Sequence, residues 1–177
     1  NNLTHISSLQ RIFPESYVWM DRFTMKNLEL FNSNSINGFN LSDTIDETIT
    51  SMGSRKFKSW IAFPLIDKKE IKKRQEIVKS IMSDDEISRL LDLNLNNISD
   101  IERLMSKIAT YKISPRELVN LKSSLENVDL IKDSLLVYSG VLKNYGKSLP
   151  SSKSIIREIS KTLKDDSPVS ILKGDFI

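Results

Sequence analysis

The sequence contains no cysteine among its 177 residues and a single histidine, His5. Without cysteine, the chain can form no disulfide framework, no zinc knuckle and no thiol nucleophile, which suits a reducing compartment. A metal site built from several histidines is excluded in the same way. We expect His5 to be a surface or boundary residue.

Long apolar runs are also missing. The apolar stretch from Ile61 to Ile66 contains Pro64, and it is far shorter than the roughly 20 residues that a membrane-spanning helix needs. No charged segment followed by an apolar one opens the chain, so we expect no secretion signal and no membrane helix. The sequence therefore predicts a cytoplasmic protein.

The length and composition are those of one ordinary globular domain. The chain has 177 residues, of which 39% are hydrophobic and 28% charged, and this is enough to bury a core. It begins with Asn1 and ends within the apolar rise from Gly174 to Ile177. Because natural termini usually trail off in polar residues, we expect the chain to be a piece of a longer polypeptide.

Three capping-box patterns predict helix starts, at Asp67–Glu70, Ser99–Glu102 and Ser114–Glu117. The third is the most complete, because Pro115 occupies the first helical position. Apolar residues follow each box at helical spacing. They are Ile71, Val78, Ile81 and Met82, then Ile101, Leu104, Met105 and Ile108, then Leu118, Leu121, Leu125 and Val128.

Further patterns complete a mainly helical fold. A short helix is predicted from Ser42 to Asp46, and another begins at a Ser51 cap and ends at Pro64. A last helix, with Ile155, Ile156, Ile159 and Leu163 on one side, ends before Pro168, and residues 140–150 are predicted to form a loop. Strand-like alternation is confined to small elements near both ends, at residues 17–20, 28–31 and 169–177.

Gly146-Lys147-Ser148 has the form of the end of a phosphate-binding P-loop. A P-loop needs its first glycine five residues before the second, so that successive backbone amides surround the phosphates. Val141 stands at that position and Gly140 comes one residue too early. We therefore expect no nucleotide binding at Lys147.

Two acidic pairs and five aromatic residues are weaker candidates. Asp84-Asp85 and Asp165-Asp166 could ligate a metal, but both lie where a helix start or a turn is predicted. Trp19, Phe23, Phe57, Trp60 and Phe63 could stack on bases; their spacing beside other apolar residues favours core packing instead. The sequence thus predicts no catalytic, cofactor-binding or metal-binding residue.

Positive charge is concentrated in one block. Residues 55–83 contain nine basic side chains against three acidic ones, and all nine lie between Arg55 and Lys79. Such a block can be a nucleic-acid surface. It can also be a solvated, lysine-rich helix face, which is the interpretation we favour.

Two segments resemble a known family. The stretch from Asp21 to Phe31, with Thr24 and Leu28-Glu29-Leu30, and the stretch from Thr50 to Leu65, with Arg55 and Trp60, are similar to the opening of the lever (core) domain of bacterial MutS-type mismatch-repair proteins. The likeness continues in order through most of the chain. It includes Ser42-Asp43-Thr44, Ile71 to Gln75, Asp100 to Arg103, Ser114 to Leu118, Leu121 to Leu125 and Asp165 to Ile177.

The resemblance implies a domain organisation. It makes residues 1–177 one domain, the first portion of the lever, that is, of the third MutS domain. Residues 1–31 would be the opening segment with a strand, residues 42–164 the helical body, and residues 165–177 the approach to a missing clamp domain. Arg55 and Arg116 match family positions, and we assign them to helix-end hydrogen bonds.

The resemblance also implies a function. The lever would transmit conformational change between the DNA clamp and the ATPase domains of a mismatch-recognition protein. The parent would be a homodimeric ATPase that uses ATP and Mg²⁺ and binds mismatched double-stranded DNA, whereas this portion would be no enzyme and hold no cofactor. The alternative is a free-standing helical adaptor that binds an acidic partner through the basic block at 55–79. An enzyme, resting on the near-miss P-loop, ranks third.

Overall fold

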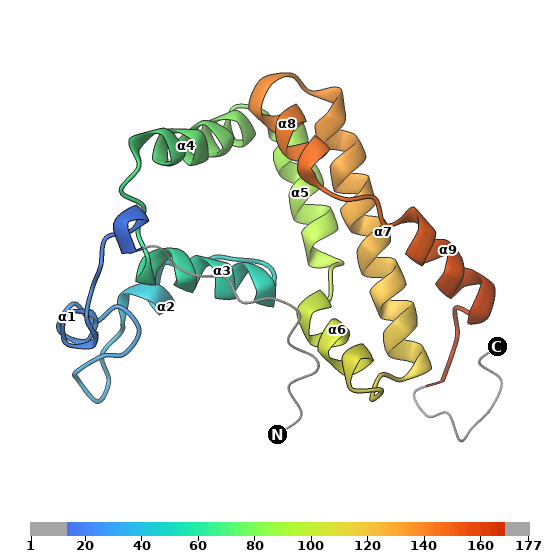
Figure 1. The fold of residues 1–177 in the computed structure, drawn as a ribbon, viewed down its shortest axis with the longest axis horizontal. Coiled ribbons are helices and arrows are strands. Elements are labelled where there is room, and N and C mark those ends of the chain that lie inside the picture. Colours follow the sequence, from blue (N-terminus) through green and yellow to red (C-terminus); the bar gives the residue numbers. More distant parts are fainter. Residues whose placement is uncertain (1–13, 169–177) are drawn as a thin grey trace. The chain divides into compact units, whose positions relative to one another are not determined.

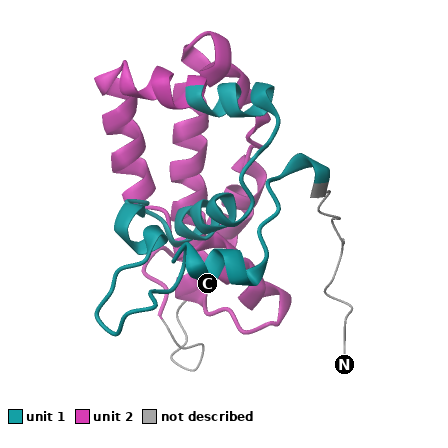
Figure 2. Cartoon of the chain, turned by 90° about the vertical axis from the view of Figure 1, so that its left-hand side faces the viewer, with its two compact units in different colours: residues 1–75 teal, residues 76–177 magenta. Residues whose placement is uncertain are grey.

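The computed structural model describes residues 14–168, and the chain is mainly helical, as predicted (Figure 1). In this range no helix combines the length and apolar character needed to cross a membrane. Backbone contacts divide the chain into two compact units, Asn1–Gln75 and Glu76–Ile177 (Figure 2). The boundary between them falls inside one helix, so the single domain inferred from the resemblance stays a prediction.

The first unit contains a 3-10 turn, η1 (Pro14–Ser16), and the helices α1 (Arg22–Asn27), α2 (Leu41–Ile45) and α3 (Ser51–Ala62). It also contains the first half of α4 (Lys68–Met82). Helix α1 lies between residues 17–20 and 28–31, the two stretches near the start of the chain where strands were predicted. Asp21 caps it, because the Asp21 carboxylate accepts a hydrogen bond from the Thr24 N–H at 2.7 Å.

Among residues 14–75, the β structure of the first unit is one antiparallel bridge between Tyr17 and Leu65. Hydrogen bonds flank it, from the Val18 N–H to the Pro64 carbonyl at 2.8 Å and from the Ile66 N–H to the Ser16 carbonyl at 3.2 Å. The predicted strand at 28–31 is wrong, since these residues form the turn that ends α1. Glu29 there has φ 49°, a left-handed conformation incompatible with a strand. The strand predicted at 169–177 lies outside the described residues.

The residue that caps helix α3 lies one position before the predicted cap, Ser51. The Thr50 hydroxyl, not Ser51, accepts the capping hydrogen bond from the Gly53 N–H at 3.0 Å. The helix ends at Ala62, before Pro64, as predicted. At the start of α4, the Asp67 carboxylate accepts from the Lys69 N–H at 2.7 Å.

The second unit is built around the long helix α7 (Pro115–Val137), which contacts α5 (Asp85–Asn96), α6 (Ile101–Ala109), α8 (Gly140–Ser148) and α9 (Lys153–Thr162). Its core consists of Ile87, Ile131, Leu135 and Leu142, all at least 92% buried. Ile77 and Ile81 of α4 pack against this core. Of the predicted apolar stripes, Ile81 packs on this core and Leu104 and Leu121 are buried. Val78, Met82 and Met105 are 55%, 78% and 51% exposed, so the prediction is wrong for them.

Two sequence predictions for this unit are wrong in detail. Asp100 rather than Ser99 caps α6, and its side chain accepts from the Arg103 N–H at 3.1 Å. Residues 140–148 form helix α8 rather than a loop. Gly140 has φ +62° and allows the chain to turn sharply from α7 into α8.

Candidate functional site

Helix α7 is the structural centre of the second unit. Its 23 residues span about 34 Å at 1.5 Å per residue. It begins with the predicted capping box: Ser114 Oγ accepts from the Glu117 N–H at 3.3 Å, and Glu117 Oε2 accepts from the Ser114 N–H at 3.0 Å. Three buried polar residues, Lys122, Ser124 and Asp129, lie along it. Together with Glu117, they connect α7 to its neighbours.

The first connection joins α6 to α7. Lys107 Nζ donates a hydrogen bond to Glu117 Oε1. This bond and the one from the Ser114 N–H lower the pKa of Glu117 from 4.5 to about 2. The Lys107 and Glu117 side chains are only 32% and 27% exposed. Glu117 therefore serves as a helix cap and as an interhelical ion-pair partner at the same time.

The second connection precedes α6. Ser124 is fully buried, and its hydroxyl accepts from the Ser99 N–H at 3.0 Å while donating to the Asn120 carbonyl at 2.8 Å. The backbone of Ser99 is thus bonded to α7, while its neighbour Asp100 caps α6. This contact joins residues 25 positions apart in the sequence, and it fixes where α6 begins relative to α7.

Two further connections lie on either side of α9. Asp129 is 8% exposed, and its Oδ1 accepts from the N–H of Ser152, the residue just before α9, at 3.2 Å. Lys122, 9% exposed, donates through Nζ to Asp165 Oδ1, beyond the end of α9. Because the α9 cap residue makes no side-chain capping bond of its own, a carboxylate on α7 binds that helix end instead.

Gly146 explains how α8 approaches α7. A Cβ at this position would lie 2.9 Å from Leu135 Cβ and 3.3 Å from the backbone of Leu135 and Leu136. Since real Cβ atoms do not approach so closely, only glycine allows the two helices to pack at this distance. Gly146 therefore has a packing role that its place in a P-loop-like pattern did not indicate.

The arrangement around Lys147 is unlike a P-loop. A P-loop joins a strand to the N-terminus of a helix, where free amides bind phosphate. Here residues 135–137 end helix α7, and residues 146–148 end helix α8. The free backbone groups at such an end are carbonyls, which repel phosphate.

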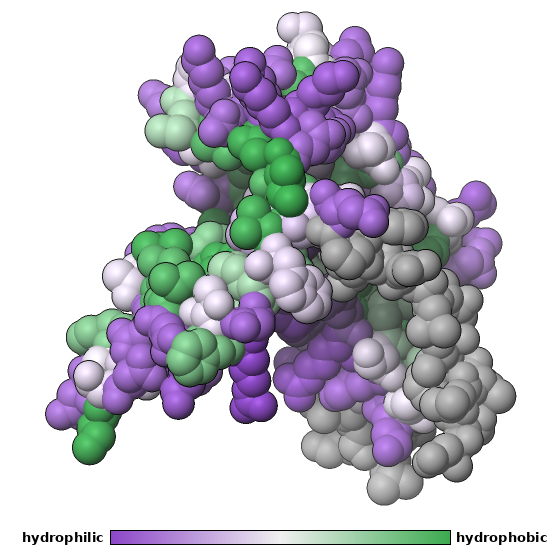
Figure 3. Space-filling model, turned by 60° about the vertical axis from the view of Figure 1, so that its left-hand side comes forward, coloured by the Kyte–Doolittle hydropathy of each residue, from purple (hydrophilic) through white to green (hydrophobic). Residues whose placement is uncertain are grey.

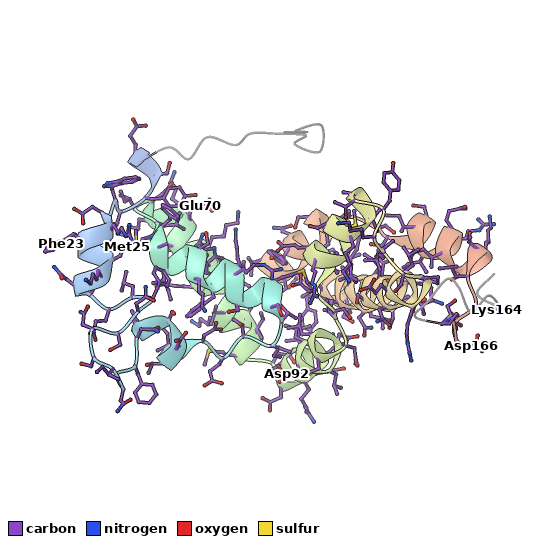
Figure 4. All side chains as sticks on the ribbon, turned by 90° about the horizontal axis from the view of Figure 1, so that it is seen from below. Phe23, Met25, Glu70, Asp92, Lys164 and Asp166 are labelled. Atoms are coloured by element: carbon purple, nitrogen blue, oxygen red, sulfur yellow. The ribbon has the colours of Figure 1, made fainter. Side chains whose placement is uncertain are left out.

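The acidic pairs lie at a helix start and a turn, as predicted. Asp84 Oδ1 caps α5 by accepting from the Glu86 and Ile87 N–H groups at 2.9 and 3.2 Å, and the Ile87 bond is the main cause of its lowered pKa. Asp165 pairs with Lys122, and Asp166 lies beside it in the turn after α9 (Figure 4). Across residues 14–168 no cluster of three metal-ligating side chains occurs. His5 is outside this range.

Four of the five aromatic candidates divide into two groups. Phe57 and Phe63 are partly buried, and Phe63 packs edge-on against Tyr17 with the ring centres 6.2 Å apart. Trp19 and Phe23 are 69% and 71% exposed, so the prediction of core packing is wrong for them. Phe23 lies on α1, a six-residue helix that buries no residue (Figure 4).

Trp60 has a specific partner. It is 41% exposed, and the Arg74 guanidinium lies 3.8 Å from its ring centre. This cation–π contact ties α3 to α4 within the first unit. On the face of the molecule drawn in the space-filling view, groups of hydrophobic residues (green) lie next to strongly hydrophilic ones (purple) (Figure 3).

The basic block at 55–79 occupies α3 and α4. Several of its charges have partners within the first unit: Lys58 lies 3.8 Å from Asp43, Lys73 lies 3.9 Å from Glu70, and Arg74 covers Trp60. Three neighbouring lysines on α4 differ from these. Lys68, Lys69 and Lys72 are exposed, and none of them forms an ion pair with any residue in the described range 14–168.

Sequence reasoning did not identify Lys122, Ser124 and Asp129 as connecting residues. One signal was present: Lys122 and Asp129 are seven residues apart, and two helical turns place both on one side of α7. Charged residues within a predicted apolar helix indicate buried partners. Their partners, Asp165 and Ser152, could not be read from the sequence.

These contacts define the second unit as a helical scaffold, in which polar side chains of one long helix bind the helices around it. A family model described as MutS domain III matches residues 23–177. The chain belongs to the MutS domain III family.

Relatives named DNA mismatch repair protein MutS align with the whole chain. The protein of Flavobacterium johnsoniae is 44% identical over 178 residues, and that of Christiangramia forsetii is 43% identical over 178; each alignment covers 100% of this chain. The relative from Cytophaga hutchinsonii is 36% identical over 99% of this chain. The chain spans about one fifth of the length of these relatives, 20% to 21%.

Proposed function

We propose that this chain is the first portion of the lever domain of a MutS-type mismatch-recognition ATPase. Its role is to transmit conformational change between the DNA clamp and the ATPase domains. The observation that carries the proposal is the set of four polar connections between α7 and its neighbours, made by Glu117, Ser124, Asp129 and Lys122. A long helix fixed at several points along its length moves as one body.

The chemistry of DNA repair would reside elsewhere in the parent protein. Relatives about five times longer than this chain leave room for an ATPase domain with its ATP and Mg²⁺, for the clamp and for mismatch reading. The parent would bind mismatched double-stranded DNA as a homodimer in the cytoplasm. This portion would act as a mechanical link without a catalytic residue or cofactor of its own.

Softening α7 at exposed positions tests the proposal. The test introduces Glu126→Gly and Asp133→Gly together into a full-length protein that carries this chain. The two substitutions should make α7 more flexible, because glycine is less favourable than alanine in a helix by about 1 kcal/mol per residue. Both side chains are exposed. We expect mismatch binding to stimulate ATP hydrolysis less, while separate affinities for DNA and ATP change little.

The matched control is the pair Glu126→Ala and Asp133→Ala. It removes the same two side chains, including the weak 4.0 Å ion pair of Asp133 with Lys153, but retains a strong helix former. The proposal requires that mismatched DNA stimulates ATP hydrolysis less in the glycine variant, while the alanine variant keeps the wild-type stimulation. Equal stimulation in both variants would show that the stiffness of α7 is irrelevant.

The absence of nucleotide chemistry from this portion is tested separately. Titration of the isolated chain with Mg-ATP should show no binding, because Lys147 lies at the C-terminal end of α8, where carbonyls rather than amides are free. Micromolar binding that Lys147→Ala abolishes would overturn this part of the proposal. The lever proposal is also favoured over a free-standing adaptor, since the relatives carry this segment within a much longer chain.

A further inference from the structure

Helix α9 packs on α7 with less burial than the other helices that contact α7 (Figure 1). Helices α5, α6 and α8 each bury at least one apolar side chain: Ile87, Leu104 and Leu142, respectively. None of the ten residues of α9 is buried. Segments with few buried apolar contacts open at a low cost in free energy. Of these four helices, α9 is therefore the one that detaches most easily.

Polar contacts hold α9 at both of its ends. Asp129 accepts a hydrogen bond from the N–H of Ser152, just before the helix, at 3.2 Å. Lys122 donates to Asp165, in the turn that follows the helix. Asp129 and Lys122 have opposite charges and are only 8% and 9% exposed. The docking of α9 thus depends on two buried charged residues of α7.

The turn after α9 is not tightly packed on α7. A cavity of about 450 Å³ is lined by Lys122 and by residues 160–165, among which Leu163 is the one hydrophobic residue. The Lys122 side chain is 11% exposed, whereas that of Asp165 is 81% exposed. The ion pair therefore joins a buried ammonium group to a carboxylate at the surface, beside a space that apolar side chains do not fill.

The ion pair fixes the position of the turn without making the docked state much more stable. Removing two charges from water costs about as much free energy as their attraction returns, and both ions regain water when the turn leaves α7. The detached helix is not stable either. Its ten residues are fewer than the roughly 12 to 15 that an isolated helix needs in water, and Ser152 supplies no side-chain cap. Detachment therefore unfolds α9.

We propose that α9 detaches from α7 and unfolds locally, and that the Lys122–Asp165 ion pair controls this equilibrium. When α9 detaches, Glu117 still joins α7 to α6, and Ser124 still binds the Ser99 N–H before α6. This role rests on the proposed function, because it makes α9 the part of the lever that yields while α7 stays rigid.

Hydrogen exchange measured by mass spectrometry tests the local opening in a full-length protein that carries this chain. Relative to their intrinsic rates, the hydrogen-bonded amides of α9 should exchange at least about tenfold faster than those of α8. Helix α8 is a matched reference, because it has nine residues and also packs on α7. Equal protection of the two helices would overturn the proposal.

Two substitutions test the ion pair. Asp165→Ala leaves the Lys122 ammonium group buried without its partner, which strongly disfavours the docked state, so exchange of α9 should rise by at least about tenfold. Lys122→Met removes the buried charge and keeps a good helix former, so exchange of α9 should stay the same or become slower. The double variant should behave like Lys122→Met, because no buried ammonium group remains. An equal rise from Asp165→Ala in both backgrounds would overturn the role of the ion pair.

The matched control is Asp166→Ala, in the same turn. It removes the same charge from an exposed side chain that has no ion pair within the described range 14–168, so exchange of α9 should not change. A rise as large as in Asp165→Ala would indicate a general charge effect and overturn the proposal. A rise in α8 as large as in α9 would overturn it as well, since the opening would then be global.

The proposed function is tested separately from α9. A wild-type protein whose ATP hydrolysis does not respond to mismatched DNA would contradict the proposed function, whereas the exchange pattern of the same protein decides the detachment of α9 alone.

Discussion

Glu117 gives the sharpest test of the connections around α7. Its carboxylate binds Lys107 on α6 through one oxygen and the Ser114 N–H through the other. Glu117→Gln keeps an acceptor oxygen and the shape of the side chain, and glutamine is itself a capping-box residue. The substitution therefore removes the charge while largely preserving the cap.

The size of the effect follows from the pKa. A pKa lowered from 4.5 to about 2 corresponds to about 3 kcal/mol at most, at 1.36 kcal/mol per pH unit. The carboxylate is 27% and the ammonium 32% exposed, and solvent weakens such a pair. We expect Glu117→Gln to lower the free energy of unfolding at pH 7 by about 1 to 2 kcal/mol.

The pH dependence has a definite sign. Because the pKa of Glu117 is lower in the folded chain than in the unfolded one, its charge stabilises the fold above pH 4.5. That contribution is lost as the pH falls from 4.5 to about 2. Urea unfolding of wild type and Glu117→Gln at several pH values should show a stability difference that shrinks over this window and vanishes near its lower end.

The control is Glu126→Gln on the exposed side of the same helix. Comparing each variant with wild type at the same pH cancels the titration of the other carboxylates. A Glu117→Gln difference that is equally large at pH 7 and at pH 2 would refute the argument, because it would come from shape rather than charge. A loss as large in Glu126→Gln would refute it as well.

Substitutions at three further positions test packing and capping by urea unfolding. Gly146→Ala should destabilise the chain by about 1 to 2 kcal/mol, because overpacking against Leu135 at 2.9 Å outweighs the gain in helix propensity; a more stable variant would contradict this packing. Asp129→Ala should cost about 1 to 3 kcal/mol by leaving the buried Ser152 N–H unpaired. Asp129→Asn should cost less than half as much, since it keeps the acceptor and replaces an oxygen, Oδ2, that has no hydrogen-bond partner; equal losses would show that the charge itself is required. Ser114→Ala should lose about 1 kcal/mol, the usual contribution of an N-cap, and a loss below about 0.3 would mean that the helix begins elsewhere.

Local sequence signals predicted the start of a helix correctly where every residue of the capping motif was present. Ser114, Pro115 and Glu117 specify the start of α7, because both hydrogen bonds of a capping box are made within four residues and proline occupies the first helical position. For α6 and α3 the observed cap lies one residue from the predicted Ser99 and Ser51, since Asp100 and Thr50 are also residues that accept capping hydrogen bonds. Adjacent capping residues cannot be ranked from the sequence alone.

Prediction failed where a partner distant in the sequence decides the structure. Residues 140–148 contain two glycines, which favour a loop, yet they form α8 because Gly146 allows close packing on Leu135. Trp19 and Phe23 are residues of the type that usually form a core, but they are 69% and 71% exposed, and α1, which carries Phe23, buries no residue. Whether such side chains are buried depends on which other segments pack against them, and the local sequence does not show this.

The sequence by itself determined the helical class, the α7 cap, the family and the position of the basic block. These features depend on the order and spacing of neighbouring residues. They can be predicted from the sequence because capping hydrogen bonds and helical periodicity involve residues close together in the chain. Only the tertiary structure decided that Lys122 pairs with Asp165, that Asp129 binds the Ser152 N–H, and that Ser124 binds the Ser99 N–H. Each of these contacts joins residues 23 to 43 positions apart, and such pairing is fixed by how the helices pack rather than by any local pattern.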